Sequence, residues 1–332
     1  MFSISFLPSH LLNLSPSRDR RGSATVMHEP EWRKQLRELA TGTVLFDERM
    51  DRHTSIGVGG PADALVVPES TAELGRLVAL LRAGGIPVFF VGNGTNLIVR
   101  DGGFRGVIVV TKGLRSVRLE PRGEGRAAIH AAAGAALAEV VALSAREGLA
   151  GMEFCAGIPG SVGGGIRMNA GAYGSELKDV LESVDLLNGG GSFRRCTRSA
   201  LQFEYRHLAL PEGACVLGGV FDLARGDRGA IEGRIRGILG TRSGKHPLQH
   251  RSAGSVFKNP RGMPAGRIID EAGLKGLTLG GARVSEMHGN FIVNLGSATA
   301  RDIIGLIGLV RERVREKTGI DLEPEVKIIG EE

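Results

Sequence analysis

The stretch "VFFVGNGTNLIVRDGGFRG", residues 88–106, decides how the N-terminal part of the chain folds. An apolar run typical of a buried strand leads into Gly92, Asn93, Gly94, Thr95 and Asn96. Glycines allow consecutive backbone N–H groups to turn toward one anion, and the Thr and Asn side chains add further donors. The loop is therefore a candidate diphosphate cradle, and a plain hairpin turn is the alternative.

Two common nucleotide-binding loops do not fit this stretch. The dinucleotide-binding fingerprint requires a glycine where Leu97 stands, and a helix where a second strand-like run follows. A Walker A loop would require Gly-Lys-Ser/Thr, which does not follow here. We therefore expect a phosphate-binding loop between two strands, which differs from both the dinucleotide-binding fingerprint and the Walker A loop.

On both sides of this stretch, strand and helix patterns alternate, and this alternation predicts a small α/β unit. "STAELGRLVALLRAGGIP", residues 70–87, has a leucine stripe at helical spacing and two glycines that end it. Ser70 and Glu73 have the spacing of a capping box. Strand-like runs at 64–67 and 106–110 lie on either side.

After residue 112 the pattern changes to short alternating strands, a helix at 136–147 and strands near 180–198 and 214–223. A helix over 228–240 leads into a third unit, which ends with a helix capped by Thr299 and Asp302. We predict an α+β chain divided at 27–112 (completed by 320–332), 113–225 and 226–319. Residues 1–26 are interpreted as a disordered extension, with Met27 as an alternative start.

A second glycine-dense stretch, "GIPGSVGGGIRMNAGAYGSE" at 157–176, favours a large flat ligand lying against the backbone. Pro159 stands where the nucleophile elbow of a serine hydrolase has glycine, which disfavours that class. A flexible linker is the alternative, and the interspersed Ile158, Val162 and Ile166 argue against it.

Composition excludes several function classes. The chain has 332 residues, a net charge of +6 and no long basic run, so nucleic-acid binding is disfavoured. Three distant cysteines and no Cys/His cluster give neither a disulfide framework nor a metal site, so we expect a cytoplasmic protein with reduced thiols. No apolar run has transmembrane length. We expect a monomer or a weak oligomer.

Three further stretches carry chemistry-bearing side chains: "FEYRHL" at 203–208, "TRSGKHPLQHRSAGSVFKNP" at 241–260, and "LEPE" at 322–325. Arginine offers a bidentate fork for a carboxylate, and the cations before Ser255 suit a diphosphate. Each stretch taken alone also has a plain structural explanation. The first could be a surface arginine on a strand, the second a turn serine and the third a solvated edge strand.

Taken in order, these stretches together with "GGPADALVVP" and "LKGLTLGGARVSEMHGNFIVN" resemble the UDP-N-acetylenolpyruvoylglucosamine reductases from about residue 45 to the C-terminus. The resemblance implies a two-part FAD-binding domain of the vanillyl-alcohol-oxidase/PCMH type and a C-terminal α/β substrate domain. It implies noncovalent FAD reduced by NADPH, hydride transfer from flavin N5 to the vinyl carbon of UDP-N-acetylglucosamine enolpyruvate, and protonation to UDP-N-acetylmuramate for peptidoglycan.

The resemblance also assigns site residues. Arg206, Ser255 and Glu325 match the family's catalytic positions, with Ser255 as proton donor. The expected FAD contacts are Gly92, Asn93, Gly94, Thr95, Asn96, Leu97, Gly157, Gly160, Ser161, Gly163, Gly164, Asn169, Gly171 and Ala172. The expected substrate contacts are Tyr205, Lys245, Lys258, Asn259, His288 and Asn290.

This chain departs from the family in one respect, because the tyrosine-bearing loop that clamps the uridine in some members is missing and the chain resembles the shorter subclass. Another FAD oxidoreductase of the same fold, acting on a small hydroxylated substrate, is the alternative enzyme. It would not predict "AGSVFKNP" or "LEPE". A nucleotide-binding regulatory module would have no use for Arg206, Ser255 and Glu325 together.

Overall fold

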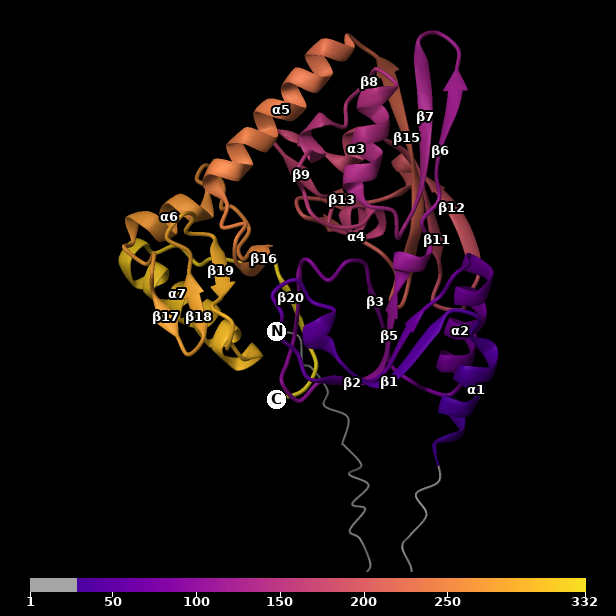
Figure 1. The fold of residues 1–332 in the computed structure, drawn as a ribbon, viewed down its shortest axis with the longest axis horizontal. Helices are drawn as coiled ribbons and strands as arrows, with labels where there is room; N and C mark the ends of the chain where they lie inside the picture. Colours follow the sequence, from indigo (N-terminus) through magenta and orange to yellow (C-terminus); the bar gives the residue numbers. More distant parts are fainter. Residues whose placement is uncertain (1–28) are drawn as a thin grey trace, which may run out of the picture.

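The computed structural model describes residues 29–332 and shows three lobes (Figure 1). We call residues 29–112 with 320–332 lobe 1, residues 113–225 lobe 2 and residues 226–319 lobe 3. The extension predicted at 1–26 and the alternative start at Met27 lie outside the described residues. The division into domains at these boundaries stays a prediction.

Lobe 1 holds a four-stranded sheet in the order β1-β2-β5-β3, in which β2 and β3 both run parallel to β5. Its elements are α1 (Glu31–Leu39), β1 (Thr43–Arg49), β2 (Pro61–Val67), α2 (Thr71–Ala83), β3 (Val88–Val91) and β5 (Phe104–Val110). The predicted strand, helix, strand order is confirmed. Leu74, Leu77 and Leu81 pack with Val107 and Val109 in one core, because the helical stripe faces the sheet.

The capping box predicted for α2 is only half formed. Ser70 Oγ accepts a hydrogen bond from the backbone N–H of Glu73 at 3.1 Å, as predicted. The Glu73 carboxylate instead accepts hydrogen bonds from the backbone N–H groups of Thr41, Gly42 and Glu69, at 2.7 to 2.9 Å. Three donors stabilise a buried carboxylate better than the single N–H of Ser70 would.

Lobe 2 is built on a six-stranded antiparallel sheet with β12-β11-β15-β7-β6 as its main path and β8 beside β15. Its larger elements are β6 (Val117–Arg122), β7 (Arg126–Ala132), α3 (Leu137–Arg146), β8 (Leu149–Ala150), α4 (Val162–Arg167), β11 (Leu181–Leu187), β12 (Phe193–Thr197) and β15 (Cys215–Arg225). Two short hairpins complete it, β9 (Gly171–Ala172) with β10 (Ser175–Glu176) and β13 (Phe203–Glu204) with β14 (His207–Leu208).

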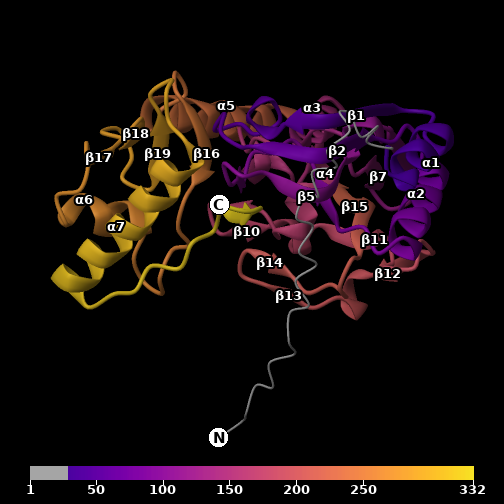
Figure 2. The ribbon, with the colours of Figure 1, turned by 90° about the horizontal axis from the view of Figure 1, so that it is seen from below.

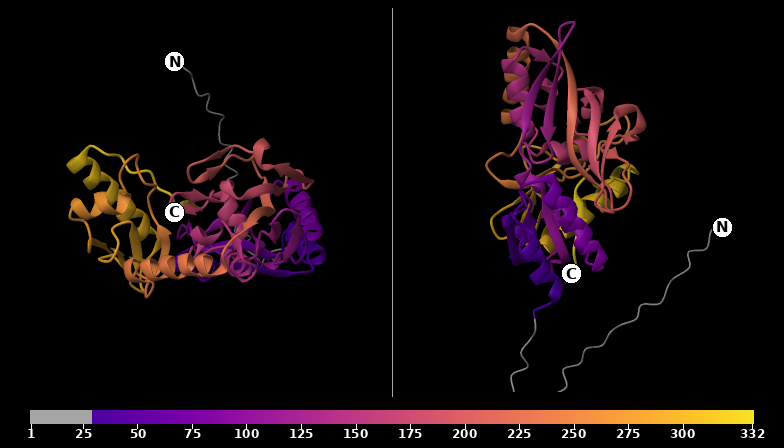
Figure 3. Two further views of the ribbon diagram at one scale, coloured as in Figure 1. Left: turned by 90° about the horizontal axis from the view of Figure 1, so that it is seen from above. Right: turned by 90° about the vertical axis from the view of Figure 1, so that its right-hand side faces the viewer.

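Helix α5 (Arg228–Lys245) leads from lobe 2 to the rest of lobe 3 and extends beyond the predicted end at residue 240. Figure 3 (left) shows it running along one edge of the molecule. Lobe 3 then forms a four-stranded sheet in the order β16-β19-β18-β17, set apart from lobes 1 and 2 in Figure 2. Its elements are β16 (Arg251–Ser255), α6 (Ala265–Glu271), β17 (Thr278–Leu279), β18 (Ala282–Val284), β19 (Phe291–Asn294) and α7 (Ala300–Thr318).

The start of α7 follows the predicted pattern, because Thr299 Oγ1 and the Asp302 carboxylate each accept a hydrogen bond from the other residue's backbone N–H. Lobe 1 adds a second cap. The Asp101 carboxylate accepts hydrogen bonds from Ala300 N and Arg301 N, both at 2.9 Å. Negative charge at a helix N-terminus is stabilising, so this contact fastens lobe 3 to lobe 1.

Lobes 1 and 3 also share a hydrophobic core. Ile56, Val58 and Ile98 of lobe 1 are buried in the same cluster as the apolar face of α7. The chain's last segment crosses this boundary, because Glu325 N donates to Val256 O at 2.7 Å and β20 (Lys327–Ile329) pairs in parallel with β4 (Leu97–Val99). This crossing positions the site described next.

Candidate functional site

A cavity of about 1380 Å³ is lined by residues of all three lobes. Ligand pockets commonly measure about 300–1,000 Å³, so this one has room for a dinucleotide and a second ligand. Five of its lining residues are Arg or Lys and two are Glu, so the walls favour anions. The cations are Arg167, Arg206, Arg242, Arg251 and Lys327, and the carboxylates are Glu212 and Glu325.

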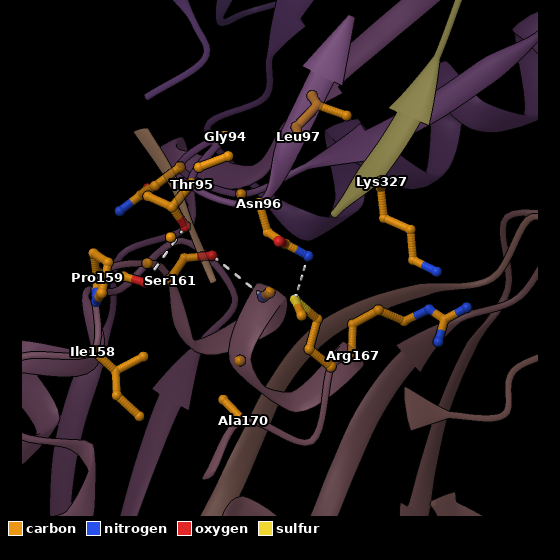
Figure 4. A pocket seen from close by; sticks show the side chains of 18 of the residues that line it. Gly94, Thr95, Asn96, Leu97, Ile158, Pro159, Ser161, Arg167, Ala170 and Lys327 are labelled. Carbon is orange, nitrogen blue, oxygen red and sulfur yellow. Dashed lines mark hydrogen bonds between the residues drawn. The ribbon is translucent and has the colours of Figure 1, made fainter. Parts of the chain in front are cut away.

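The predicted cradle, residues 92–97, joins β3 to β4 and faces the start of α4 (Figure 4). Gly94 has φ +64°, and a Cβ there would lie 2.1 Å from the carbonyl oxygen of His53. A Cβ on Gly92 would lie 2.2 Å from Ser161 Oγ. Gly94 therefore tolerates no side chain, and a Cβ on Gly92 would displace the Ser161 hydroxyl group, so the backbone of the loop stays accessible from the cavity.

The second glycine-dense stretch forms the opposite wall and is not a linker. Ser161 caps α4 by accepting a hydrogen bond from Gly164 N at 3.3 Å, and Val162 and Ile166 are buried in the core of lobe 2. A Cβ on Gly163 would lie 2.8 Å from the Cβ of Ala133, so the glycine lets α4 approach β7. The two stretches meet where Thr95 Oγ1 donates to Pro159 O at 3.4 Å.

These walls fit a diphosphate-bearing, flat cofactor such as FAD. Two glycine-lined backbones face each other, hydroxyl groups stand between them, and the cations of the cavity outnumber its carboxylates. The predicted FAD contacts other than Asn169 all line the cavity. Asn169 does not, because its amide bonds to Glu176, to Glu204 O and to Lys178 N within lobe 2.

Arg206 and Glu325 meet inside this cavity from distant parts of the chain. Arg206 Nε lies 3.5 Å from Glu325 Oε2, and the two side chains are 18% and 15% exposed. Arg206 stands between β13 and β14 with φ +58°, a left-handed conformation that costs free energy for any residue except glycine. The hairpin therefore stores strain at the residue that it aims into the cavity.

The protonation of Glu325 follows from its surroundings. Burial raises the pKa of this carboxyl group above its usual value, and the positive charges of Arg206 and Lys258 oppose the shift without cancelling it. Burial disfavours the charged form of an acid, so Glu325 holds its proton to a higher pH than an exposed glutamate does.

Ser255 lies at the end of β16, close along the chain to Val256, the residue that binds the backbone of Glu325. The residue lines the cavity. Within residues 29–332 its hydroxyl group forms no hydrogen bond to the protein, so it is free to donate to a ligand. Gly254 has φ +72°, which bends the strand beside Ser255.

The predicted substrate contacts divide into two groups. Asn259 and His288 line the cavity, whereas Tyr205, Lys245, Lys258 and Asn290 do not. Asn290 is buried and exchanges hydrogen bonds of 2.8 and 2.9 Å with the backbone of Phe257, so its amide holds two segments of lobe 3 together.

The remaining members of the second group have roles outside the cavity. Lys258 Nζ forms a salt bridge of 2.6 Å with Glu323. Tyr205 packs its ring 5.1 Å from the guanidinium of Arg206 and so supports a residue that does line the cavity. Lys245 is exposed at the last residue of α5.

The structure adds His246 and Phe291 to the cavity beside His288, which the sequence predicted as a substrate contact. His246 and His288 pack edge-on with ring centroids 5.6 Å apart, and Phe291 packs against both. Burial, followed by the charge of Arg242 and the nearby His288, lowers the pKa of His246 to about 4. Lobe 3 therefore presents a neutral aromatic wall, and the signal for it was the "GKHP" run, residues 244–247, in the stretch quoted at 241–260.

Arg167 and Lys327 also line the cavity; Arg167 lies in the glycine-dense stretch at 157–176, and Lys327 follows "LEPE" by two residues. Neither was assigned, because each stood among residues with a more specific signature. In the part of the chain that the structure describes, no group of three or more His, Cys, Asp or Glu side chains could hold a metal ion.

Comparisons with known proteins point to one family. A family model described as "UDP-N-acetylenolpyruvoylglucosamine reductase, C-terminal domain" matches residues 246–329, and one described as "FAD binding domain" matches residues 62–197. The UDP-N-acetylenolpyruvoylglucosamine reductase of Syntrophus aciditrophicus is 52% identical over 307 residues, which cover 92% of this chain and 98% of that protein.

Other relatives and one solved structure agree. The reductase of Geotalea uraniireducens is 45% identical over 298 residues, which cover 90% of this chain and 98% of that one. The crystal structure of the Thermus caldophilus reductase matches with a TM-score of 0.72 at 36% identity and covers 86% of this chain and 98% of that one. The match extends through all three lobes, beyond the FAD-binding part alone.

Proposed function

This chain belongs to the UDP-N-acetylenolpyruvoylglucosamine reductase family, and from that premise we propose how its cavity carries out the reaction. The protein is an FAD-containing oxidoreductase of peptidoglycan synthesis. We propose that Arg206, Glu325 and Ser255 surround the reacting carbons of the enolpyruvyl substrate. The observation that carries the proposal is the Arg206–Glu325 pair, 3.5 Å apart in the cavity that Ser255 also lines.

Bound between the two glycine-lined walls, FAD would supply a hydride that it has taken from NADPH. The chain's own part begins with holding the ligands. The backbone N–H groups of residues 92–96 and the Ser161 and Thr95 hydroxyl groups would hold the diphosphate, with no lysine from a Walker A motif. The neutral His246–His288–Phe291 wall of lobe 3 would pack against a flat ring of the substrate.

Arg206 stabilises the charge that develops on the substrate. When a hydride adds to the terminal vinyl carbon, the electron pair of the double bond moves toward the carbon that bears the carboxylate. A fixed cation beside that carboxylate stabilises this charge more than it stabilises the starting substrate, which is the requirement for a rate effect. The left-handed backbone of Arg206 holds the guanidinium there before the substrate arrives.

Glu325 assists only if it carries a proton. An ionised carboxylate would repel the developing anion, whereas a protonated one can donate a hydrogen bond to it. Because burial raises the pKa of Glu325, the structure favours the second case.

Ser255 then completes the reaction by donating its hydroxyl proton to the carbon next to the carboxylate. The new C–H bond takes the electron pair that the hydride displaced, and the serine oxygen regains a proton from water. Serine is a weak acid, so the donation depends on how basic the substrate anion is and on the short approach that the strand bend at Gly254 allows.

We also propose that the protein is located in the cytoplasm. Cys155, Cys196 and Cys215 are all unpaired and buried, which supports the predicted cytoplasmic location. No helix in residues 29–332 is long and apolar enough to cross a membrane. The predicted monomer or weak oligomer stays a prediction.

Anaerobic stopped-flow absorbance of the Ser255→Ala holoenzyme tests the proposal, because the flavin signal separates the two half-reactions. Reduction by NADPH should stay within about threefold of the wild type, while reoxidation by the enolpyruvyl substrate should slow by about 10²–10⁴-fold. Ser252→Ala, which also removes a cavity hydroxyl from β16, is the matched control and should change neither rate. Equal losses in both half-reactions would show that Ser255 is not the proton donor.

A further inference from the structure

One wall of the cavity has no part in the chemistry described so far. Arg167 at the end of α4, His207 of β14 and Lys327 of β20 all line the cavity. Figure 4 shows the side chains of Arg167 and Lys327 extending to the same side of the cavity from two different lobes. Within the described part of the chain, neither of these cations takes part in a salt bridge, although Lys258 and Arg206 nearby both do.

The wall presents hydrogen-bond donors only. Arg167 Nη1 lies 3.3 Å from His207 Nδ1, and the same nitrogen donates to the carbonyl oxygen of Leu208. A guanidinium cannot accept a hydrogen bond, so His207 Nδ1 is the acceptor and the imidazole carries its proton on Nε2. Burial, followed by the charge of Arg167, lowers the pKa of His207 and keeps the ring neutral.

This arrangement is costly for the protein alone. Burial lowers the pKa of the Arg167 guanidinium, and no carboxylate acts in the opposite direction. The positive charges of both Arg167 and Lys327 act on His207, so the three groups are neighbours. A charge that is half-buried, as Arg167 is, is normally paired, so its unpaired guanidinium indicates a ligand group that is rich in acceptors or carries negative charge. Lys327, at an exposed position on the same wall, adds to the positive charge that such a group would meet.

The position of this cationic wall in the cavity indicates which ligand it contacts. Helix α4 begins beside the cradle at Ser161 and ends at Arg167, about 9 Å further on at 1.5 Å per residue. At the other side, Lys327 is two residues beyond Glu325 and His207 is next to Arg206. The wall thus lies between the diphosphate cradle and the catalytic pair. A cofactor with its diphosphate in the cradle and its reactive ring at the catalytic pair passes along it.

We propose that Arg167 and Lys327 stabilise the negative charge that the bound FAD gains on reduction, and so raise its reduction potential. A hydride from NADPH brings two electrons and one proton and leaves NADP⁺, so the net charge of the cofactor falls by one. A cation that faces this charge stabilises the reduced form more than the oxidised form. The inference rests on the FAD part of the proposed function and is independent of the second substrate.

The reduction potential of the Arg167→Gln holoenzyme, measured by equilibration with a reference dye, tests this directly. Glutamine can still donate to Leu208 O, so the substitution removes the charge and keeps a hydrogen bond to the hairpin. We expect the equilibrium to shift about tenfold toward the oxidised form, which is about 30 mV for a two-electron couple. Lys327→Gln, at an exposed position, should shift it in the same direction, and Arg167→Lys should restore most of the wild-type value.

Arg198→Gln is the matched control. Arg198 also braces the β13–β14 hairpin, because its guanidinium lies 5.5 Å from the centre of the Phe203 ring, but it does not line the cavity. Its substitution should leave the potential unchanged. An unchanged potential in both Arg167→Gln and Lys327→Gln would overturn the inference, even if the KM of the enolpyruvyl substrate rose. A wild-type protein that binds no FAD would instead contradict the proposed function.

Discussion

Replacing glycines in α5 with alanine should stabilise this protein. Gly233, Gly237 and Gly240 lie inside an 18-residue helix whose only buried residue is Ile231. A Cβ added at any of the three would meet nothing within 4 Å. Glycine in an exposed helix interior is about 0.8–1.0 kcal/mol less favourable than alanine, because it loses more backbone entropy on folding. The triple variant should therefore gain about 2–3 kcal/mol in the free energy of unfolding.

The corresponding change in Tm is small but measurable. Unfolding entropy is about 2.1 cal/mol/K per residue, so roughly 300 ordered residues give about 0.6 kcal/mol/K, and the gain corresponds to a rise in Tm of about 3–5 °C. Urea and thermal unfolding, followed by circular dichroism and flavin fluorescence on the wild type and the triple variant, measure both quantities.

A glycine of the opposite kind serves as the control. Gly319 ends α7 and also has open space around its Cβ position, but its φ is +72°. Alanine there should destabilise the protein by about 1 kcal/mol, because the left-handed conformation is unfavourable for a side chain. If the α5 triple variant showed no gain while Gly319→Ala lost stability as expected, α5 would not be a continuous helix in solution, and the connection between lobes 2 and 3 would have to be revised.

Three further predictions follow from individual contacts. Glu73→Ala should cost about 1–3 kcal/mol in urea unfolding, because it leaves three partly buried N–H groups without their acceptor. The pKa of Glu73 is lowered in the folded protein, so the stability that its carboxylate contributes is present above the ordinary pKa of a glutamate and is lost as the pH falls through the lowered one. Glu73→Gln should flatten that pH dependence, and an unchanged profile would contradict this. Asp101→Ala should cost about 1 kcal/mol and expose lobe 3 to limited proteolysis sooner, whereas equal digestion rates would exclude a fastening role. Glu325→Gln should slow flavin reoxidation while leaving NADPH oxidation intact, and wild-type turnover would exclude a role for Glu325 in the reaction.

The elements that the sequence predicted well are those fixed by neighbours along the chain. The Thr299–Asp302 cap, the leucine stripe of α2 and the glycine ends of helices all act within about four residues, so their pattern is readable without the fold. The strand after the cradle is of the same kind, because the apolar run beginning at Leu97 is itself local.

The residues whose contacts the sequence could not predict are those whose partners are far away in sequence. Glu73 bonds to Thr41 and Gly42 across 32 and 31 residues, and a local capping rule cannot anticipate that competition. Asn290 was expected to contact substrate, but its amide binds the backbone of Phe257, 33 residues away. An asparagine in a glycine-flanked loop has the same local appearance in both roles.

The role of an individual glycine is a property that the sequence alone does not reveal. The sequence has 51 glycines, and their number alone favoured close approach to a ligand. In the structure they divide into physically different classes. At Gly94 a Cβ would overlap a backbone oxygen 2.1 Å away, so the cradle requires this glycine, and at Gly92 it would displace the Ser161 hydroxyl group. At Gly233 and Gly237 there is nothing to overlap, and glycine only weakens the helix. The same residue type thus marks a cofactor site in one lobe and a weak connection between lobes in another, and only the distances to non-local atoms separate the two.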